Sequence, residues 1–153
     1  TAGGGAHHGY PVKTDSFDRL LIYDIENDYW ELSAPMSINR RYCEVGLLDE
    51  KIWVIGGFYY SKPENEPRRG WDDKPVNSVE IYDPETGKWS AGPLLDVPRA
   101  ETVVCTIAGR LYVFGSTGKE TIFNTLSIGT GENEWRIEPP APVTNPADES
   151  SIP

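Results

Sequence analysis

Histidine, cysteine and methionine are scarce in this chain of 153 residues, which holds two, two and one of them. Two cysteines, Cys43 and Cys105, are too few for the disulfide framework of a small secreted domain, and we expect free thiols. His7 and His8 are adjacent, so in an extended chain they point to opposite sides and do not converge as metal ligands. We therefore expect no metal site, no cofactor and no catalytic group in these residues.

Long apolar runs and clustered positive charge are also missing. No run approaches the roughly 18 apolar residues that a membrane span needs. The chain has 14 lysines and arginines against 24 acidic residues, a net charge of −10. Because phosphate binding depends on clustered basic residues, we expect no nucleic-acid partner and no membrane partner. Free thiols are typical of proteins in a reducing compartment, so we expect a cytoplasmic protein.

One short motif recurs three times, and a tryptophan ends each copy. The copies read LLIYDIENDYW, VEIYDPETGKW and LSIGTGENEW, and they end at Trp30, Trp89 and Trp135. Tyr23 and Tyr82 precede the first two tryptophans by the same spacing, and Ile128 takes that place in the third copy. A repeat of about 50 residues with strand-like texture predicts the blades of a β-propeller.

Further residues recur in register with the tryptophans. Arg40 and Arg99 each precede an apolar strand, KIWVI or RLYVF, that ends in Gly56-Gly57 or Gly115-Ser116. This order of arginine, apolar strand, glycine pair, tyrosine and tryptophan resembles the kelch repeat over nearly all of residues 3–138. The last copy departs from the pattern at Ser116 and at Ile128-Gly129. The resemblance implies an all-β fold, a kelch-type β-propeller segment of about two and a half four-stranded antiparallel blades.

The repeats divide the chain into four parts. We expect an incomplete first blade over 1–33, a second over 34–91 with a long loop at 58–76, and a third over 92–138. Residues 139–153 are rich in proline and polar side chains and indicate a tail or linker. Closed propellers have about 4 to 8 blades. We therefore expect the remaining blades to come from the same parent chain or from another copy.

Acidic residues alternate at Asp24, Glu26 and Asp28, as calcium ligands do. The glycine that an EF-hand loop requires does not follow them. They coincide with the expected turn between two strands, so we interpret them as turn residues.

The loop 58–76 is the strongest binding candidate. Loops longer than about 12–15 residues in compact domains are usually functional or disordered. Tyrosine, tryptophan and arginine are enriched in binding hot spots, and they gather here. The candidates in the loop are Tyr59, Tyr60, Arg68, Arg69 and Trp71. The alternative is a self-solvated loop, since acidic residues alternate with the basic ones.

The segments that enter each blade supply the other candidates. In an up-and-down blade, alternate connections emerge on one side, so the long loop shares a face with the residues after Arg40 and Arg99. In kelch-like substrate receptors that face binds a peptide, which implies contacts from Arg41, Tyr42 and Glu101 here. We interpret Arg40 and Arg99 themselves as structural, with hydrogen bonds between blades.

The resemblance implies a protein-interaction module that binds a peptide or protein partner. One form is a substrate receptor of a cullin-type ubiquitin ligase, because many kelch proteins carry an upstream BTB domain. The alternative is a secreted or periplasmic sugar-active propeller enzyme of the oxidase or epimerase type. Fold alone does not decide between binding and catalysis. No segment matches the copper-site pattern of the oxidases, so we favour the interaction module.

Overall fold

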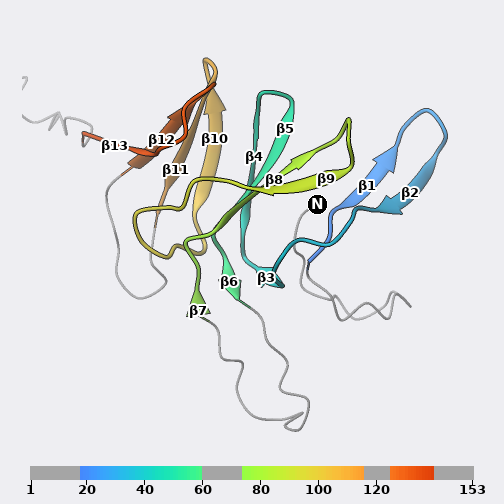
Figure 1. Ribbon diagram of the computed structural model, residues 1–153, viewed down its shortest axis with the longest axis horizontal. Coiled ribbons are helices and arrows are strands. Elements are labelled where there is room, and N and C mark those ends of the chain that lie inside the picture. The colour runs from blue at the N-terminus through green and yellow to red at the C-terminus, as the bar shows by residue number, and fades with distance from the viewer. Residues whose placement is uncertain (1–17, 60–73, 116–124, 140–153) are drawn as a thin grey trace, which may run out of the picture.

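The computed structural model describes residues 18–59, 74–115 and 125–139, and within them all regular structure is β-strand (Figure 1). Two four-stranded antiparallel sheets stand side by side, with a two-stranded hairpin beyond one of them. This arrangement confirms the predicted all-β propeller segment. No helix among these residues has the length and apolar character required to cross a bilayer.

The first blade contributes one hairpin, and the second blade contributes a complete sheet in the order β4-β5-β8-β9. The strands of these two blades are β1 (Leu21–Asp24), β2 (Tyr29–Leu32), β4 (Glu44–Leu48), β5 (Lys51–Ile55), β8 (Val79–Asp83) and β9 (Lys88–Ala91). Consecutive strands pair antiparallel, as in an up-and-down blade.

The third blade repeats that order as β10-β11-β12-β13. Its strands are β10 (Val103–Ile107), β11 (Arg110–Phe114), β12 (Thr125–Gly129) and β13 (Arg136–Glu138). The third copy therefore folds like the second, although Ile128 replaces the tyrosine of the motif. Ile128 is fully buried and packs in the core between the two sheets, so an aliphatic side chain fills the space there.

A small three-stranded sheet was not expected from the sequence. It has the order β3-β6-β7 and consists of β3 (Arg40–Arg41), β6 (Phe58–Tyr59) and β7 (Lys74–Pro75). The expected loop 58–76 thus begins and ends in short strands that pair with each other and with the entrance to the second blade. Two-residue strands with ordinary side chains carry no periodicity that a sequence could reveal.

Tyrosine and tryptophan of the repeated motif are cross-strand partners. Tyr23 lies opposite Trp30 and Tyr82 opposite Trp89, with ring centroids 4.8 and 5.1 Å apart. The hairpin turns between them are closed by an aspartate. Asp24 accepts hydrogen bonds from the backbone of Glu26 and Asn27, which confirms that this acidic segment is a turn.

The same tryptophans join neighbouring blades. The indole Nε1 of Trp89 donates to the carbonyl oxygen of Ala34 at 2.7 Å, and that of Trp135 donates to Pro93 at 2.9 Å. Both acceptors lie in the segment that leaves the preceding blade. Trp30 is 60% exposed and has no such acceptor in the described residues. The recurring tryptophan is therefore an inter-blade hydrogen-bond donor as well as a packing group.

A buried arginine holds the second blade together. The Arg40 side chain is fully buried and donates to the carbonyl oxygens of Gly56 and Ser78 and to the Glu80 carboxylate, the last at 2.6 Å. Its role is structural, as expected, but these hydrogen bonds lie within one blade. The backbone of Arg99 supplies the bonds between blades, because Gly57 N donates to its carbonyl oxygen.

The glycine pair permits that close approach. Gly56 and Gly57 have φ angles of 58° and 93°. A Cβ at Gly56 would lie 2.3 Å from the carbonyl oxygen of Arg99, and one at Gly57 would lie 2.8 Å from that of Arg41. Both distances are shorter than van der Waals contact, so only glycine fits here.

The far face of the third blade is uncovered in this structure. Ile107 is 58% exposed and Phe114 39%, whereas their counterparts Leu48 and Ile55 in the second blade are 3% and 0% exposed. The counterparts are buried because the third blade covers them. The apolar character of the face thus agrees with the expectation that each blade packs on both sides.

We predict that Arg40→Ala lowers the free energy of unfolding by about 3–5 kcal/mol, because Glu80 would keep a buried charge without its partner. The matched control is Arg136→Ala. Arg136 is bonded to Glu132 at the same distance, 2.6 Å, but it is 66% exposed, so its loss should cost at most about 1 kcal/mol. Chemical denaturation measures both. Equal losses would show that Arg40 does not hold the blade.

Replacement of Trp89 by phenylalanine should remove the hydrogen bond to Ala34 and keep most of the ring packing. We expect this variant to lose about 1 kcal/mol more stability than Trp30→Phe, which has no described bond to lose. Urea titration of the two variants provides the comparison. Equal losses would contradict an energetic role for the indole bond.

Candidate functional site

The candidate contact face lies at one end of the sheets, where β3, β6 and β7 gather below β4, β5 and β8 (Figure 1). Arg41 on β3 pairs with Phe58 on β6, and Phe58 pairs with Pro75 on β7. The base of the long connection is therefore fixed to the chain that enters the second blade. The described ends of the loop thus lie at the same end of the sheets as the entrance to the second blade.

Tyr42 and Glu101 occupy equivalent places, each two residues after a buried arginine. Both have left-handed backbone conformations, with φ angles of 51° and 54°. They are also neighbours, because the Glu101 amide donates to the Tyr42 carbonyl oxygen at 3.2 Å. A bulky residue with positive φ is an outlier that costs of order 1–3 kcal/mol and occurs preferentially at functional sites.

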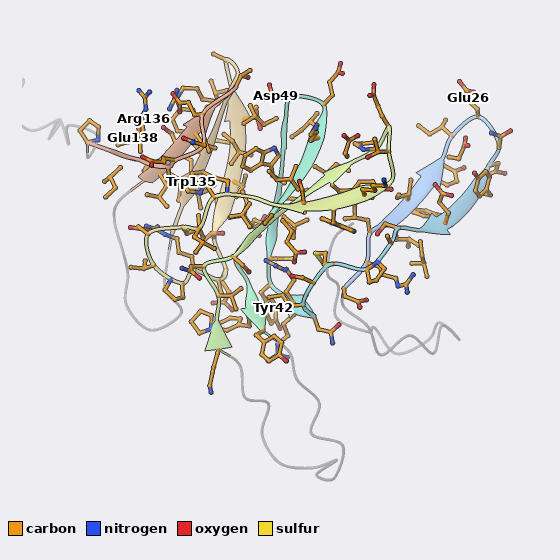
Figure 2. The ribbon with its side chains drawn as sticks, in the orientation of Figure 1. Glu26, Tyr42, Asp49, Trp135, Arg136 and Glu138 are labelled. Carbon is orange, nitrogen blue, oxygen red and sulfur yellow. The ribbon has the colours of Figure 1, made fainter. Side chains whose placement is uncertain are left out.

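Aromatic and cationic groups surround Tyr42. Its ring meets that of Phe58 edge to face at 6.2 Å, and the Arg41 guanidinium carbon lies 5.4 Å from the Tyr42 ring centroid. That distance allows a cation–π interaction. Tyr42 is nevertheless 57% exposed and lies at the β3 and β6 end, away from the β4–β5 turn that holds Asp49 (Figure 2). Its ring is held in place and still faces solvent.

Cys43 and Glu44, which follow Tyr42 in the chain, are half-buried. Burial raises the pKa of the Cys43 thiol to about 11, so the group stays protonated at neutral pH. Burial also raises the pKa of the Glu44 carboxyl. Thr102, which takes the place of Cys43 in the third blade, is 4% exposed. Cys43 lacks the thiolate character of a nucleophilic cysteine.

The structure unites part of the predicted site. Arg41, Tyr42 and Glu101 are contiguous, and Tyr59, which is 39% exposed, lies opposite Arg40 on the neighbouring strand. The other candidates, Tyr60, Arg68, Arg69 and Trp71, lie outside the described residues. The assignment of all eight residues to binding stays a prediction.

Sequence reasoning missed one member of the cluster and one property of the pair. Phe58 directly follows the glycine pair, and that position was a signal for a residue at the base of the loop. The left-handed conformations of Tyr42 and Glu101 had no signal, since glycine or asparagine is the usual residue with positive φ.

Chemically, the cluster offers binding groups. Arg41 provides a cation, Tyr42 an amphipathic ring and Glu101 an exposed carboxylate, and tyrosine and arginine are among the residues enriched in binding hot spots. Across residues 18–59, 74–115 and 125–139, no three histidine, cysteine or acidic side chains gather as a metal site would require.

Comparison with known proteins agrees with the repeat pattern and the blade topology. The kelch motif model matches residues 69–93. Human Kelch-like protein 28 is 33% identical over 98 residues, which are 64% of this chain and 16% of that protein. Human Kelch repeat and BTB domain-containing protein 12 is 28% identical over 130 residues, which are 78% of this chain and 20% of the relative.

The solved structure of YjhT has the same fold, with a TM-score of 0.63 at 17% identity over 82% of this chain and 45% of that one. The chain spans 11% to 20% of the length of the curated relatives that it matches. Motif order, four-stranded antiparallel blades and these relatives together show that the chain belongs to the kelch-repeat family.

Proposed function

We propose that this chain is part of a protein-interaction propeller, and that Arg41, Tyr42, Tyr59 and Glu101 belong to its contact face. The observation that carries the proposal is the pair of left-handed residues, Tyr42 and Glu101, joined by a backbone hydrogen bond. Glycine would adopt that backbone without strain. Because the fold itself would be served better by glycine, contact with a partner is the better explanation for large exposed side chains at these strained positions.

The loop residues extend the same face in this proposal. Tyr60, Arg68, Arg69 and Trp71 follow or precede the paired strands β6 and β7, whose register ties them to Arg41. In this proposal a partner segment bound over Tyr42 also contacts these loop residues. The mixture of Arg41 and Glu101 favours a partner with charges of both signs rather than the purely acidic peptide that an arginine-rich face selects.

At a finer level, we propose that the parent protein is a substrate receptor of a cullin-type ubiquitin ligase and works in the cytoplasm. The support is a relative, Kelch repeat and BTB domain-containing protein 12, whose name records a BTB domain beside its kelch repeats. Such a receptor needs two separable surfaces, one for the ligase and one for the substrate. This chain would supply the substrate side.

We also propose that further blades cover the apolar face with Ile107 and Phe114, from the same parent chain or from another copy. If so, residues 1–153 alone expose this face and should self-associate. Sedimentation velocity measures the outcome, and Ile107→Asp should reduce the association because it places a charge on the face. A compact wild-type monomer at all concentrations would contradict the proposal.

Tyr42→Gly and Glu101→Gly separate binding from stability. Each should change the free energy of unfolding by less than about 1 kcal/mol, because the lost backbone strain offsets the greater entropy of an unfolded glycine. Each should also deplete the proteins that co-purify with the tagged full-length protein, as measured by quantitative mass spectrometry. A cullin, if the ligase proposal holds, should stay bound to both variants.

The control for this experiment is Ile25→Ala. Ile25 is 83% exposed in the β1–β2 turn, so its loss should leave every partner in place. An unchanged partner list for both glycine variants would rule out the contact face. If captures of the wild-type protein contain other partners but no cullin, the ligase role alone would be ruled out.

A further inference from the structure

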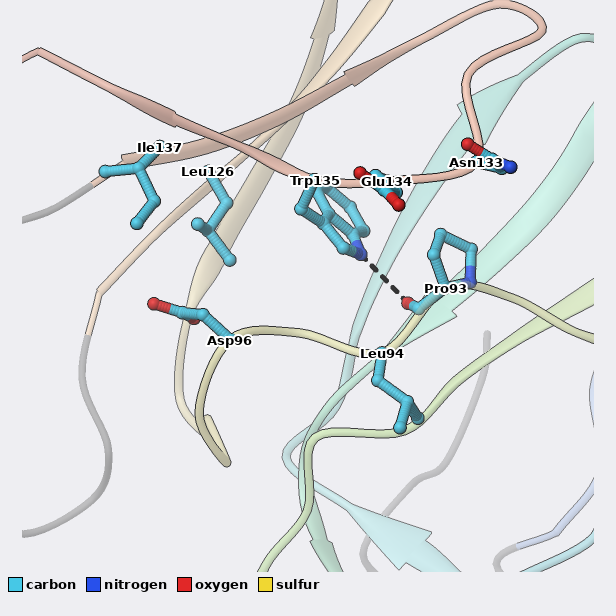
Figure 3. A pocket seen from close by; sticks show the side chains of 8 residues that line it. All are labelled: Pro93, Leu94, Asp96, Leu126, Asn133, Glu134, Trp135 and Ile137. Atoms are coloured by element: carbon cyan, nitrogen blue, oxygen red, sulfur yellow. Dashed lines mark hydrogen bonds between the residues drawn. The ribbon is translucent and has the colours of Figure 1, made fainter.

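An apolar groove lies between the segment that links the second and third blades and the outer strands β12 and β13 (Figure 3). Its volume is about 390 Å³. Leu126 and Trp135 form its floor, and the Trp135 indole is fixed by its bond to Pro93. Ile137, the cross-strand partner of Leu126, lines the groove and is 63% exposed. This volume falls within the usual range of ligand sites, about 300–1,000 Å³.

A fourth blade would leave this groove open. Trp135 directly precedes β13, and Trp135 and Ile137 stand on either side of Arg136 in the extended chain, so they point to one side of the sheet. Trp135 bonds to Pro93, which places that side toward the second blade. The exposed Phe114 belongs to the opposite face, because it follows Val113, the cross-strand partner of Leu126. Ile107 shares the face of Phe114, since it lies four residues along β10 from Val103, the partner of Phe114. The groove is therefore a surface of the propeller rim.

The corresponding place between the first and second blades is polar. Glu80 there takes the position of Leu126, since each pairs with the equivalent valine, Val54 or Val113. The Glu80 carboxylate bonds to Arg40 and to the Ser37 amide. The tryptophan spacing further sets Ala91 against Ile137 and Lys88 against Glu134. The third blade thus carries leucine, isoleucine and glutamate at the positions where the second carries glutamate, alanine and lysine.

The rim of the groove carries negative charge. Asp96 and Glu134 are among its lining residues, and no lysine or arginine is. The charge of Asp96 is compensated by the buried guanidinium of Arg99 at 2.9 Å, so the net negative charge of the rim comes from Glu134. Glu134 is exposed and has no ion-pair partner in the described part of the chain. The chain as a whole has a net charge of −10, which adds to the attraction for cations.

We propose that this groove binds a partner-protein segment in which an aliphatic side chain is flanked by lysine or arginine. The aliphatic group packs on Leu126 and Ile137, and the cation faces Glu134. Apolar floor and acidic rim select this combination, because an acidic segment would be repelled and an alanine would leave the floor uncovered. The site is separate from the contact face around Tyr42 and needs no part of that face.

The test uses three peptides and the Trp135 indole N–H resonance of the full chain, assigned with Trp135→Phe. The probe is acetyl-Gly-Lys-Leu-Lys-Gly-amide; its matched controls replace both lysines by glutamate, or the leucine by alanine. We expect a saturable shift of the resonance with the first peptide and an affinity at least about fivefold lower with each control. Added salt should weaken the binding of the lysine peptide.

Two variants return the groove to the residues of its counterpart. Ile137→Ala should lower the affinity about fivefold through lost apolar burial, and Glu134→Lys about threefold or more through charge reversal. Both positions are exposed, so folding should be retained. The control Ala91→Ile places the same aliphatic side chain at the matching position of the second blade, where Glu80 stands in place of Leu126, and should leave binding unchanged. Equal affinity for the three peptides, no shift of Trp135, or full binding by both variants would overturn the proposal.

Discussion

The buried arginine at the entrance to each of the two complete blades is the interaction on which the rest of this structure depends. Arg40 reaches the carbonyl oxygens of Gly56 and Ser78, and Arg99 reaches that of Gly115. These carbonyls lie at strand ends, where the backbone no longer has hydrogen-bond partners in the sheet. Because water cannot reach this place, the guanidinium donates the hydrogen bonds instead. A fully buried cation is tolerated only with such a set of acceptors. The arginine therefore fixes the path of the chain just before the first strand.

That fixed path explains the geometry of the contact face. Because the arginine side chain points into the blade, the chain must turn within two residues to begin the inner strand, and Tyr42 and Glu101 make that turn with positive φ. Their side chains are thereby directed outward while their backbones bond to each other. The strain at these two positions is sustained by the buried arginines beside them. The structural arginines and the residues that we propose for recognition are thus adjacent in sequence and opposite in direction.

Periodic features were predictable from the sequence because several residues repeat together. Trp30, Trp89 and Trp135 gave the repeat, and the paired motif positions gave the strands of the complete blades. The small β3-β6-β7 sheet could not be found, because pairing of two-residue strands depends on chain segments that the glycine pair brings together. The left-handed backbone of Tyr42 was equally hidden, since it results from the burial of Arg40 rather than from any preference of tyrosine.

Comparison of the repeats with one another separates the requirements of the fold from other properties. Every described inter-blade junction keeps a tryptophan that donates to a carbonyl oxygen, yet Glu80 and Leu126 differ at the same place on the sheet. The second blade requires the carboxylate because Arg40 reaches it; in the third, Arg99 pairs with Asp96 from its own segment instead. Position 126 is therefore not needed as a partner of the buried arginine in the third blade. An apolar residue there, and with it an apolar floor at the rim, is compatible with the fold because Asp96 already pairs with Arg99.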